Sequence, residues 1–367
     1  MSMEQISLFE TNDHAGTEPD ENEILHISLK ELTQIVALTN GKKPATATEN
    51  IDTARVNNTL GKMGHYLSTH NSVCVSVSGG SDSDIIVHMI STYFREHLQK
   101  VHFIFANTGI EYRATLRHLD YLEERYGIKI VQLRSDEPIP VAVKKHGVPF
   151  VSKQVSDYMQ RLQKNKFQYE DKPFSELWPS KYPRCKVGIR WWTNDWGEKS
   201  RFNIDWNKGL KKFLIAEKPT MKISAECCLR SKKSVLLNYQ DSVGCDLYIT
   251  GERKSEGGTR AGAHSSCFES SHGMDHYMPL WFWDDATKAA YKQKEKIKNS
   301  DCYEVWGLRR TGCVGCPFGQ KLWQELEIMK QYEPQCYKLC MNVFGESYDL
   351  RKKYEASREV KHEKAGE

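Results

Sequence analysis

Four cysteines stand in two close pairs that could share one metal centre. Cys227 and Cys228 are adjacent, and Cys313 and Cys316 form a CxxC pair. A CxxC turn brings two thiolates to one centre, and adjacent cysteines suit two neighbouring irons of a cluster better than a single zinc. A Cys₄ zinc site, a dithiol CxxC and buried free thiols are the alternatives. Cys302 could replace Cys227 as a ligand.

A second candidate site is a glycine-rich turn at residues 78–83, where Ser78, Gly79, Gly80, Ser81, Asp82 and Ser83 follow one another. Glycine lets backbone N–H groups approach an anion, and the start of a helix adds partial positive charge. The serines offer hydroxyl groups, and the aspartate could cap the helix or help to hold Mg²⁺. The chain lacks GxxxxGK[ST], so the turn is not a P-loop of the Walker type.

The elements around this turn alternate between strand and helix. Strand patterns cover residues 73–77, 101–106, 128–133 and 247–250, and helical patterns follow the first two. Strand–helix repeats of this spacing favour an α/β fold with a doubly wound parallel sheet. We expect residues 1–56 to form an acidic tail, a short helix and a linker, residues 57–280 a nucleotide-binding domain, and residues 281–367 a cysteine-rich helical region with the CxxC.

Composition excludes several classes of protein. Hydrophobic residues make up 39% of the 367 and aromatic residues 11%, too many for a disordered chain. No apolar run is long enough to span a membrane, and the first residues do not resemble a signal peptide. Eleven cysteines in such a chain suit metal or redox chemistry in a reducing cytoplasm better than disulfides. We therefore expect a cytoplasmic protein without a membrane partner.

Charge is unevenly distributed along the chain. Residues 1–24 hold seven acids and no Lys or Arg. The whole chain has a net charge of +4, so residues 25–367 carry +11. Residues 181–222 combine eleven Lys or Arg with four tryptophans, a composition that could bind single-stranded nucleic acid. An insertion with packed tryptophans and solvated lysines is the simpler interpretation, because no nucleic-acid motif accompanies the segment. His264, His272 and His276 surround a Gly/Ser-rich stretch, where one could be a ligand or proton donor and an ordinary loop is the simpler interpretation.

The turn at residues 78–83 resembles the SGGxDS signature of the PP-loop ATP pyrophosphatases and of their relatives, the phosphoadenosine phosphosulfate (PAPS) reductases. Further matching segments follow in the family's order: Asn107-Thr108-Gly109, His146 to Phe150, the run Gly251-Glu252-Arg253 to Glu256 with Arg260, and Met278 to Trp281. The resemblance covers roughly residues 60–320. It implies an adenine nucleotide alpha-hydrolase-like fold that binds ATP, PAPS or adenosine 5′-phosphosulfate (APS).

Carried over residue by residue, the resemblance implies three groups of site residues. The implied catalytic residues are Asp82, Ser83 and Arg253. The implied nucleotide-binding residues are Ser78, Gly79, Gly80, Ser81, Asp82, Ser83, Asn107, Thr108, Gly109, Gly251, Arg253, Glu256 and Arg260. The CC and CxxC pairs resemble the [4Fe–4S] site of APS reductases, which implies Cys227, Cys228, Cys313 and Cys316 as cluster ligands.

The resemblance leaves three functions open. An intact SGGxDS turn together with a cluster is most similar to the DNA phosphorothioation protein DndC. This combination favours activation of an acceptor by ATP-pyrophosphatase chemistry, followed by sulfur transfer to that acceptor, which could be DNA, RNA or a small molecule. A sulfur- or electron-donor protein would be a further partner. A sulfonucleotide reductase releasing sulfite is the first alternative, although the chain lacks the ECG[LI]H tail motif of that family. A nucleotide- or DNA-binding redox regulator is the second alternative.

Overall fold

A six-stranded sheet forms the centre of the α/β part of the molecule. The computed structural model describes residues 52–257, 264–271, 273–308 and 311–363, and side chains up to residue 358. Along the sheet the strands run in the order β3 (Ile130–Arg134), β2 (Val101–Asn107), β1 (Val73–Ser76), β4 (Leu247–Ile249), β6 (Met274–Tyr277) and β5 (Phe268–Ser271). All neighbours pair in parallel except β5 and β6, which form an antiparallel hairpin.

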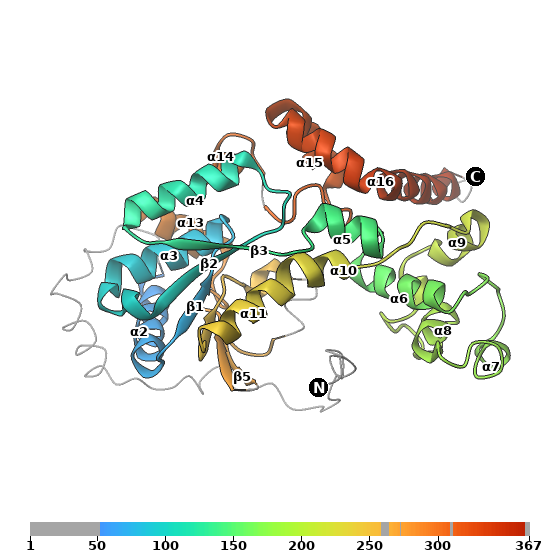
Figure 1. The fold of residues 1–367 in the computed structure, drawn as a ribbon, viewed down its shortest axis with the longest axis horizontal. Coiled ribbons are helices and arrows are strands. Elements are labelled where there is room, and N and C mark those ends of the chain that lie inside the picture. Colours follow the sequence, from blue (N-terminus) through green and yellow to red (C-terminus); the bar gives the residue numbers. More distant parts are fainter. Residues whose placement is uncertain (1–51, 258–263, 272, 309–310, 364–367) are drawn as a thin grey trace. The chain divides into compact units, whose positions relative to one another are not determined.

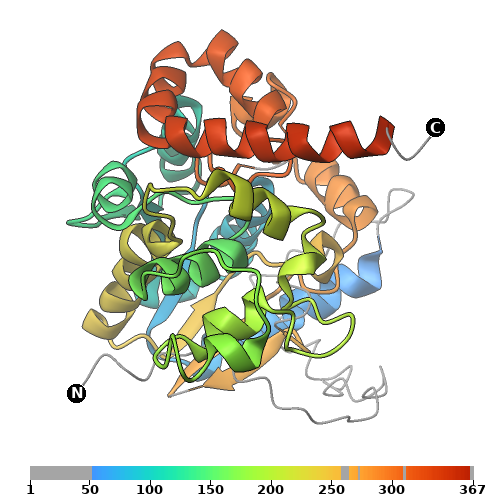
Figure 2. The same cartoon turned by 90° about the vertical axis from the view of Figure 1, so that its right-hand side faces the viewer.

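Helices cover both faces of this sheet, as Figures 1 and 2 show. Val73 and Val75 of β1 point into a core shared with α2 (Thr53–Thr69), α3 (Ser81–Tyr93), α4 (Arg113–Tyr126) and α13 (Asp285–Lys294). Cys74, between them, points into a smaller core under α11 (Ser234–Ser242). Because successive strand residues face opposite sides, this alternation confirms the predicted doubly wound sheet.

A helical region follows β3 and resumes after α13. It contains α5 (Ile139–His146), α6 (Lys153–Lys164), α7 (Phe174–Leu177), α8 (Lys186–Trp192), α9 (Leu210–Glu217), α10 (Glu226–Cys228), α14 (Asp301–Glu304), α15 (Leu322–Tyr332) and α16 (Pro334–Glu363). Short helical turns are η1 (Arg95–Lys100), η2 (Ile204–Trp206), η3 (Leu229–Lys233) and η4 (Lys254–Glu256). One continuous hydrophobic core joins these helices, so the segments on either side of β4 pack together.

The four predicted strands are all present, within two residues of their predicted ends. The hairpin of β5 and β6 was not predicted, because its short strands lie in a polar stretch with weak alternation. Helix α2 begins at Thr53, inside the predicted linker, where Asp52 accepts a hydrogen bond from the Arg55 N–H. The predicted acidic tail and its short helix lie outside the described residues, and the boundaries after residues 56 and 280 stay predictions. No helix in the described ranges is both long and apolar enough to cross a membrane.

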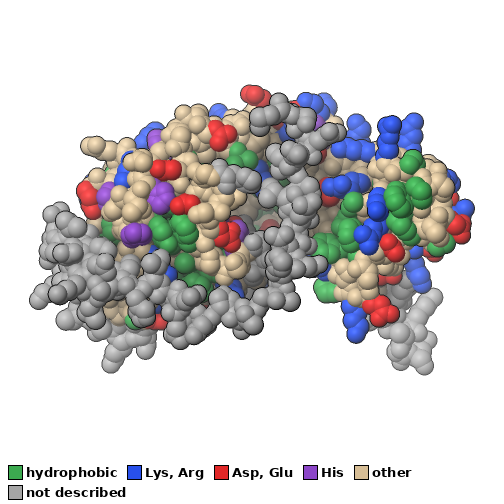
Figure 3. Space-filling view, turned by 90° about the horizontal axis from the view of Figure 1, so that it is seen from below, with side chains coloured by type: hydrophobic (Ala, Val, Ile, Leu, Met, Phe, Trp, Pro, Cys, Tyr) green, Lys and Arg blue, Asp and Glu red, His purple; other side chains and the backbone are tan. Residues whose placement is uncertain are grey.

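The basic, tryptophan-rich segment 181–222 folds as α8, η2 and α9. Trp191 and Trp192 are buried, and the Arg190 guanidinium lies 4.1 Å from the ring centre of Trp196. Trp206 is 63% exposed. Lys and Arg side chains gather on the side of the molecule that carries this segment, at the right of Figure 3. Packing therefore accounts for three of the tryptophans, and Trp206 remains available to a ligand.

Candidate functional site

The predicted phosphate turn joins the end of β1 to the first turn of α3. Gly79 has φ +64°, and a Cβ there would lie 2.7 Å from Cγ2 of Thr115, so this position requires glycine. The Ser83 hydroxyl accepts hydrogen bonds from the N–H groups of Ser78 and Gly80 and donates one to the Gly80 carbonyl. Gly80 occupies the helix cap, so Ser83 rather than Asp82 closes the turn.

Three cationic side chains surround this turn. Nε of Arg253 lies 3.0 Å from Oδ1 of Asp82, and Nζ of Lys288 lies 2.9 Å from the same oxygen. The Arg253 contact is an ion pair without hydrogen-bond alignment. Lys292 donates to the Ser81 hydroxyl at 3.1 Å, and burial lowers the pKa of its ammonium group. An anion at the turn would therefore lie between a helix N-terminus and positive side chains.

Arg253 lies in the segment after β4, and several contacts hold its side chain in place. Its side chain is only 7% exposed, and Nη1 donates to Ser255, to the Trp283 carbonyl and, at 2.8 Å, to Asp285. Gly251, two residues earlier, lies so close to the turn that a Cβ there would be 3.2 Å from the Ser83 nitrogen. The end of β4 thus packs directly against the phosphate turn.

The turn after β2 forms a further side of the site. Glu111 accepts hydrogen bonds from the N–H and the hydroxyl of Thr108, at 3.0 and 2.7 Å, and the Asn107 side chain accepts from the Gly109 N–H. Burial raises the pKa of the Glu111 carboxyl. Since β1, β2 and β4 are neighbours in the sheet, the carboxyl ends of these strands bring the three predicted nucleotide-binding segments together. Glu256 lies in η4 after β4, and Arg260 lies outside the described residues.

The four predicted cysteines line one small cavity, together with Thr108 and Lys232. Cys227 and Cys228 end α10, directly before the π-helical turn η3, and π turns are common at functional sites. Cys313 and Cys316 lie in a turn closed by a hydrogen bond from the Cys316 N–H to the Cys313 carbonyl. The cysteine cavity therefore also touches the predicted nucleotide turn through Thr108.

Gly315 allows this CxxC turn to pack. It has φ +63°, and a Cβ there would lie 2.7 Å from Sγ of Cys340 and 2.8 Å from the Tyr348 hydroxyl, both on α16. Any other residue at this position would push the CxxC turn off the helix. The long C-terminal helix thereby fixes two of the four thiols.

The electrostatics of the cavity favour a thiolate at Cys228. A hydrogen bond from the Cys227 thiol, with Lys153, Lys232 and Lys233 nearby, lowers the pKa of Cys228, while the same pairing and burial raise that of Cys227. Burial raises the pKa of Cys313 to about 11. Metal binding requires deprotonated thiols, so the lysines assist it.

Four converging thiols are the donor set that an iron–sulfur cluster uses, and in this respect the residues fit. No three of these sulfurs lie mutually within 4.8 Å, whereas a tetrahedral zinc would hold thiolates about 3.8 Å apart. The cavity measures about 10 Å³, room for one water, so a cluster would need the lining side chains to move outward. Cys302 lies elsewhere, buried with its sulfur 3.8 Å from the Thr115 hydroxyl.

Several side chains at the site were missed from the sequence. Lys288 and Lys292 are four residues apart on α13, a spacing that places them on one face but does not indicate what they contact. Asp84 is completely buried under the turn and lies 2.9 Å from His118 of α4. The Tyr303 hydroxyl shares a hydrogen bond with the Thr311 hydroxyl, and it lies so close to Gly80 that a Cβ added there would be 3.0 Å away. These contacts join residues far apart in the chain.

Parts of the chain are similar to known proteins. Residues 72–178 match the model of the phosphoadenosine phosphosulfate reductase domain. An uncharacterized protein of Methanocaldococcus jannaschii is 25% identical over 284 residues, which are 77% of this chain and 43% of that protein. The adenosine 5′-phosphosulfate reductase of Neisseria meningitidis serogroup A is 29% identical over 91 residues, 25% of this chain and 36% of that one.

A solved structure of a PAPS reductase from Candida auris, in a phosphate complex, is similar with a TM-score of 0.41 and 16% identity, over 74% of this chain and 97% of that one. The matched regions span less than half the length of the curated relatives. The domain match covers β1 to α7, and with it the phosphate turn and the turn after β2. Residues 72–178 are therefore similar to the phosphoadenosine phosphosulfate reductase domain, and this similarity is limited to part of the chain.

Proposed function

We propose that the protein is an enzyme that activates an acceptor with ATP, releases pyrophosphate and transfers sulfur to the acceptor. The observation that carries the proposal is the phosphate turn itself, with Arg253, Lys288 and Lys292 around it. Fixed cations and a helix N-terminus stabilise the charge that develops on a departing pyrophosphate. A sulfonucleotide reductase releases no pyrophosphate, so it does not need to stabilise the charge of that leaving group.

In the proposed reaction an acceptor oxygen attacks the α-phosphorus of ATP, and the bond from this phosphorus to the oxygen that bridges it to the β-phosphorus breaks. The electron pair leaves with pyrophosphate, which the Ser81 hydroxyl, Lys292 and the N-terminus of α3 would bind, while the Ser83 hydroxyl holds the turn in shape. Asp82 would keep Arg253 and Lys288 oriented, or exchange them for Mg²⁺. A sulfur nucleophile then displaces AMP from the activated acceptor. The basic segment 181–222, with the exposed Trp206, supports a DNA or RNA acceptor.

The cysteines would hold a [4Fe–4S] cluster in this proposal, through Cys227, Cys228, Cys313 and Cys316. When bound, such a cluster supplies one-electron chemistry. Thr108 lies on the cavity wall, so the cysteines and the nucleotide turn share one boundary. Lys232, also on that wall, would balance part of the negative charge of four thiolates.

A sulfonucleotide reductase is the second candidate, because the relatives in Neisseria meningitidis bear that name. Its attacking thiolate would have to come from Cys336 or Cys340. Both are buried on α16, with their sulfurs against the carbonyls of Glu111 and Val314. A thiolate in this position would need α16 to move before it reached a nucleotide.

A product assay separates the candidates. The anaerobically purified protein is offered ATP, APS and PAPS separately, each with a thiol reductant and a mixture of DNA and RNA. We expect pyrophosphate and AMP from ATP, and their loss in Asp82→Ala. Asp157→Ala is the matched control, because Asp157 forms an exposed ion pair on α6.

Sulfite from APS or PAPS, abolished in a Cys336→Ser/Cys340→Ser double variant, would overturn the proposal in favour of the reductase. Nucleic-acid binding with a steep salt dependence, without turnover of any nucleotide, would indicate the regulator instead. Pyrophosphate release that persists in Asp82→Ala would show that the phosphate turn has another role.

A further inference from the structure

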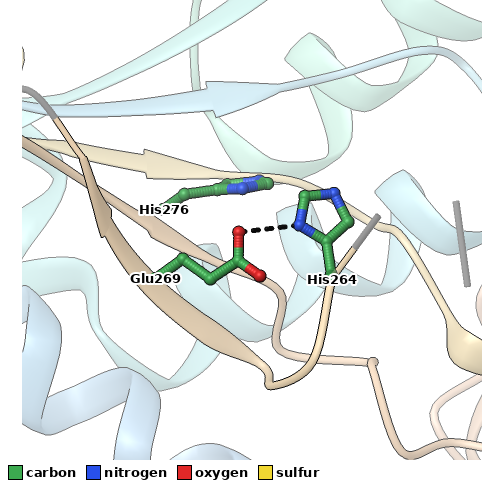
Figure 4. Close-up of side chains that lie close together, drawn as sticks. All are labelled: His264, Glu269 and His276. Carbon is green, nitrogen blue, oxygen red and sulfur yellow. Dashed lines mark hydrogen bonds and ion pairs between the residues drawn. The ribbon is translucent and has the colours of Figure 1, made fainter. Parts of the chain in front are cut away.

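Two histidines and a glutamate converge beside the hairpin of β5 and β6, and none of the three lines the cysteine cavity. Glu269 of β5 and His276 of β6 are direct cross-strand partners, and His264 precedes β5. Figure 4 shows the three side chains turned toward one another. One ligand atom of each lies within 4.8 Å of the others, and Nδ1 of His264 is 2.8 Å from Oε2 of Glu269. All three side chains are half-buried.

Both imidazoles have an outer oxygen partner. Nε2 of His264 lies 3.3 Å from Oε2 of Glu252, and Nε2 of His276 lies 2.9 Å from the Thr250 hydroxyl. The His276 ring also stacks on Tyr248, with ring centres 5.4 Å apart. Histidines that bind metals usually donate their second N–H to a carboxylate or another oxygen, which fixes the ring and the tautomer. The contacts of His264 with Glu252 and of His276 with Thr250 match this pattern.

We propose that His264, Glu269 and His276 bind one divalent transition-metal ion of the zinc class. Two imidazoles and one carboxylate are a ligand set that zinc and ferrous iron use, with the remaining positions open to water or an anionic oxygen. With metal–nitrogen and metal–oxygen bonds near 2.1 Å, the two ligand atoms of His264 and Glu269 would lie about 3.4 Å apart in a tetrahedral site. A widening of about half an ångström from the present contact is within reach of side-chain rotation.

The site adjoins the phosphate turn without sharing residues with it. Thr250 and Glu252 flank Gly251, which packs against Asp82 and Ser83. A bound ion would therefore tie the β5–β6 hairpin to the end of β4, next to the predicted nucleotide. The proposal does not depend on ATP chemistry, because it rests on these ligands alone.

The test is a titration of the full-length protein with Co²⁺, followed by its visible absorption. Cobalt on nitrogen and oxygen ligands shows d–d bands without the thiolate charge-transfer band that cysteine ligands add, so this site is distinguished from the four cysteines. We expect one equivalent of such cobalt, at least tenfold weaker binding in Glu269→Gln, and loss of the d–d bands in His264→Ala and in His276→Ala.

His65→Ala is the matched control, since His65 is an exposed histidine on α2. It should bind Co²⁺ as the wild type does. Binding that is equal in the wild type, His264→Ala and His276→Ala would overturn the proposal, and so would a spectrum with thiolate bands alone. Glu269→Gln keeps the size of the side chain, so it remains informative if a histidine variant fails to fold. Pyrophosphate assays on the same samples report on the proposed function separately.

Discussion

Replacing Arg253 by alanine should destabilise the protein strongly, because this arginine is a buried connection between three segments. Its guanidinium contacts Asp82 on the phosphate turn, the Trp283 carbonyl and Asp285 at the start of α13. The Arg253 and Asp82 side chains are only 7% and 17% exposed, so water screens the pair weakly. Removing one partner of such a pair costs about 3–5 kcal/mol when the other charge is left buried without a partner. Because Lys288 still contacts Asp82, we expect the lower end of this range.

Arg253→Lys should cost less, about 1–3 kcal/mol. Lysine keeps the positive charge, but a single nitrogen cannot reach Asp82 and the Trp283 carbonyl together. Urea unfolding followed by tryptophan fluorescence measures both variants against the wild type.

Arg117→Ala is the control for this experiment. Arg117 forms an ion pair with Asp301 at 3.4 Å, but the two side chains are 63% and 54% exposed. An exposed pair contributes about 0–1 kcal/mol. If Arg253→Ala lowers the unfolding free energy no more than Arg117→Ala does, the reasoning that burial makes this arginine a structural connection is wrong.

Three further predictions concern other parts of the molecule. Gly251→Ala should reduce pyrophosphate formation about tenfold in a folded protein, because the added methyl group displaces the phosphate turn by a few tenths of an ångström; an unchanged rate would contradict this. His88, 3.6 Å from Glu295, lowers the pKa of that carboxyl below 4.5, so the ionised carboxylate contributes stability above that pH and loses it on acidification. The difference in Tm between wild type and Glu295→Gln should therefore shrink from pH 7 to acidic pH, and a constant difference would refute the link. Trp192→Ala should cost about 3–5 kcal/mol and Trp206→Ala less than about 0.5, measured by urea unfolding, because the first ring is buried and the second is exposed.

The strands of the parallel sheet could be predicted because their signal is local. Val73, Val75 and Val77 alternate with smaller residues, and the turn Ser78 to Ser83 follows at once, so a short window holds the pattern of a strand, a turn and a helix start. The hairpin of β5 and β6 escaped prediction, because Glu269, Ser270 and Ser271 of β5 are polar and half-buried or exposed. The sheet reaches them only because β6 pairs with β4 and β5 pairs with β6.

For the candidate site too, the sequence predicted one part and only the tertiary structure decided the other. The residue types and spacings of the CC and CxxC pairs and of the phosphate turn indicated in the sequence which side chains could do chemistry. Tertiary structure alone decided that Lys288 and Lys292 face the turn, that Thr108 borders the cysteine cavity, and that His264 meets Glu269. Backbone periodicity and turn chemistry act over a few residues, whereas these contacts depend on how distant segments pack, and no short stretch of sequence contains that information.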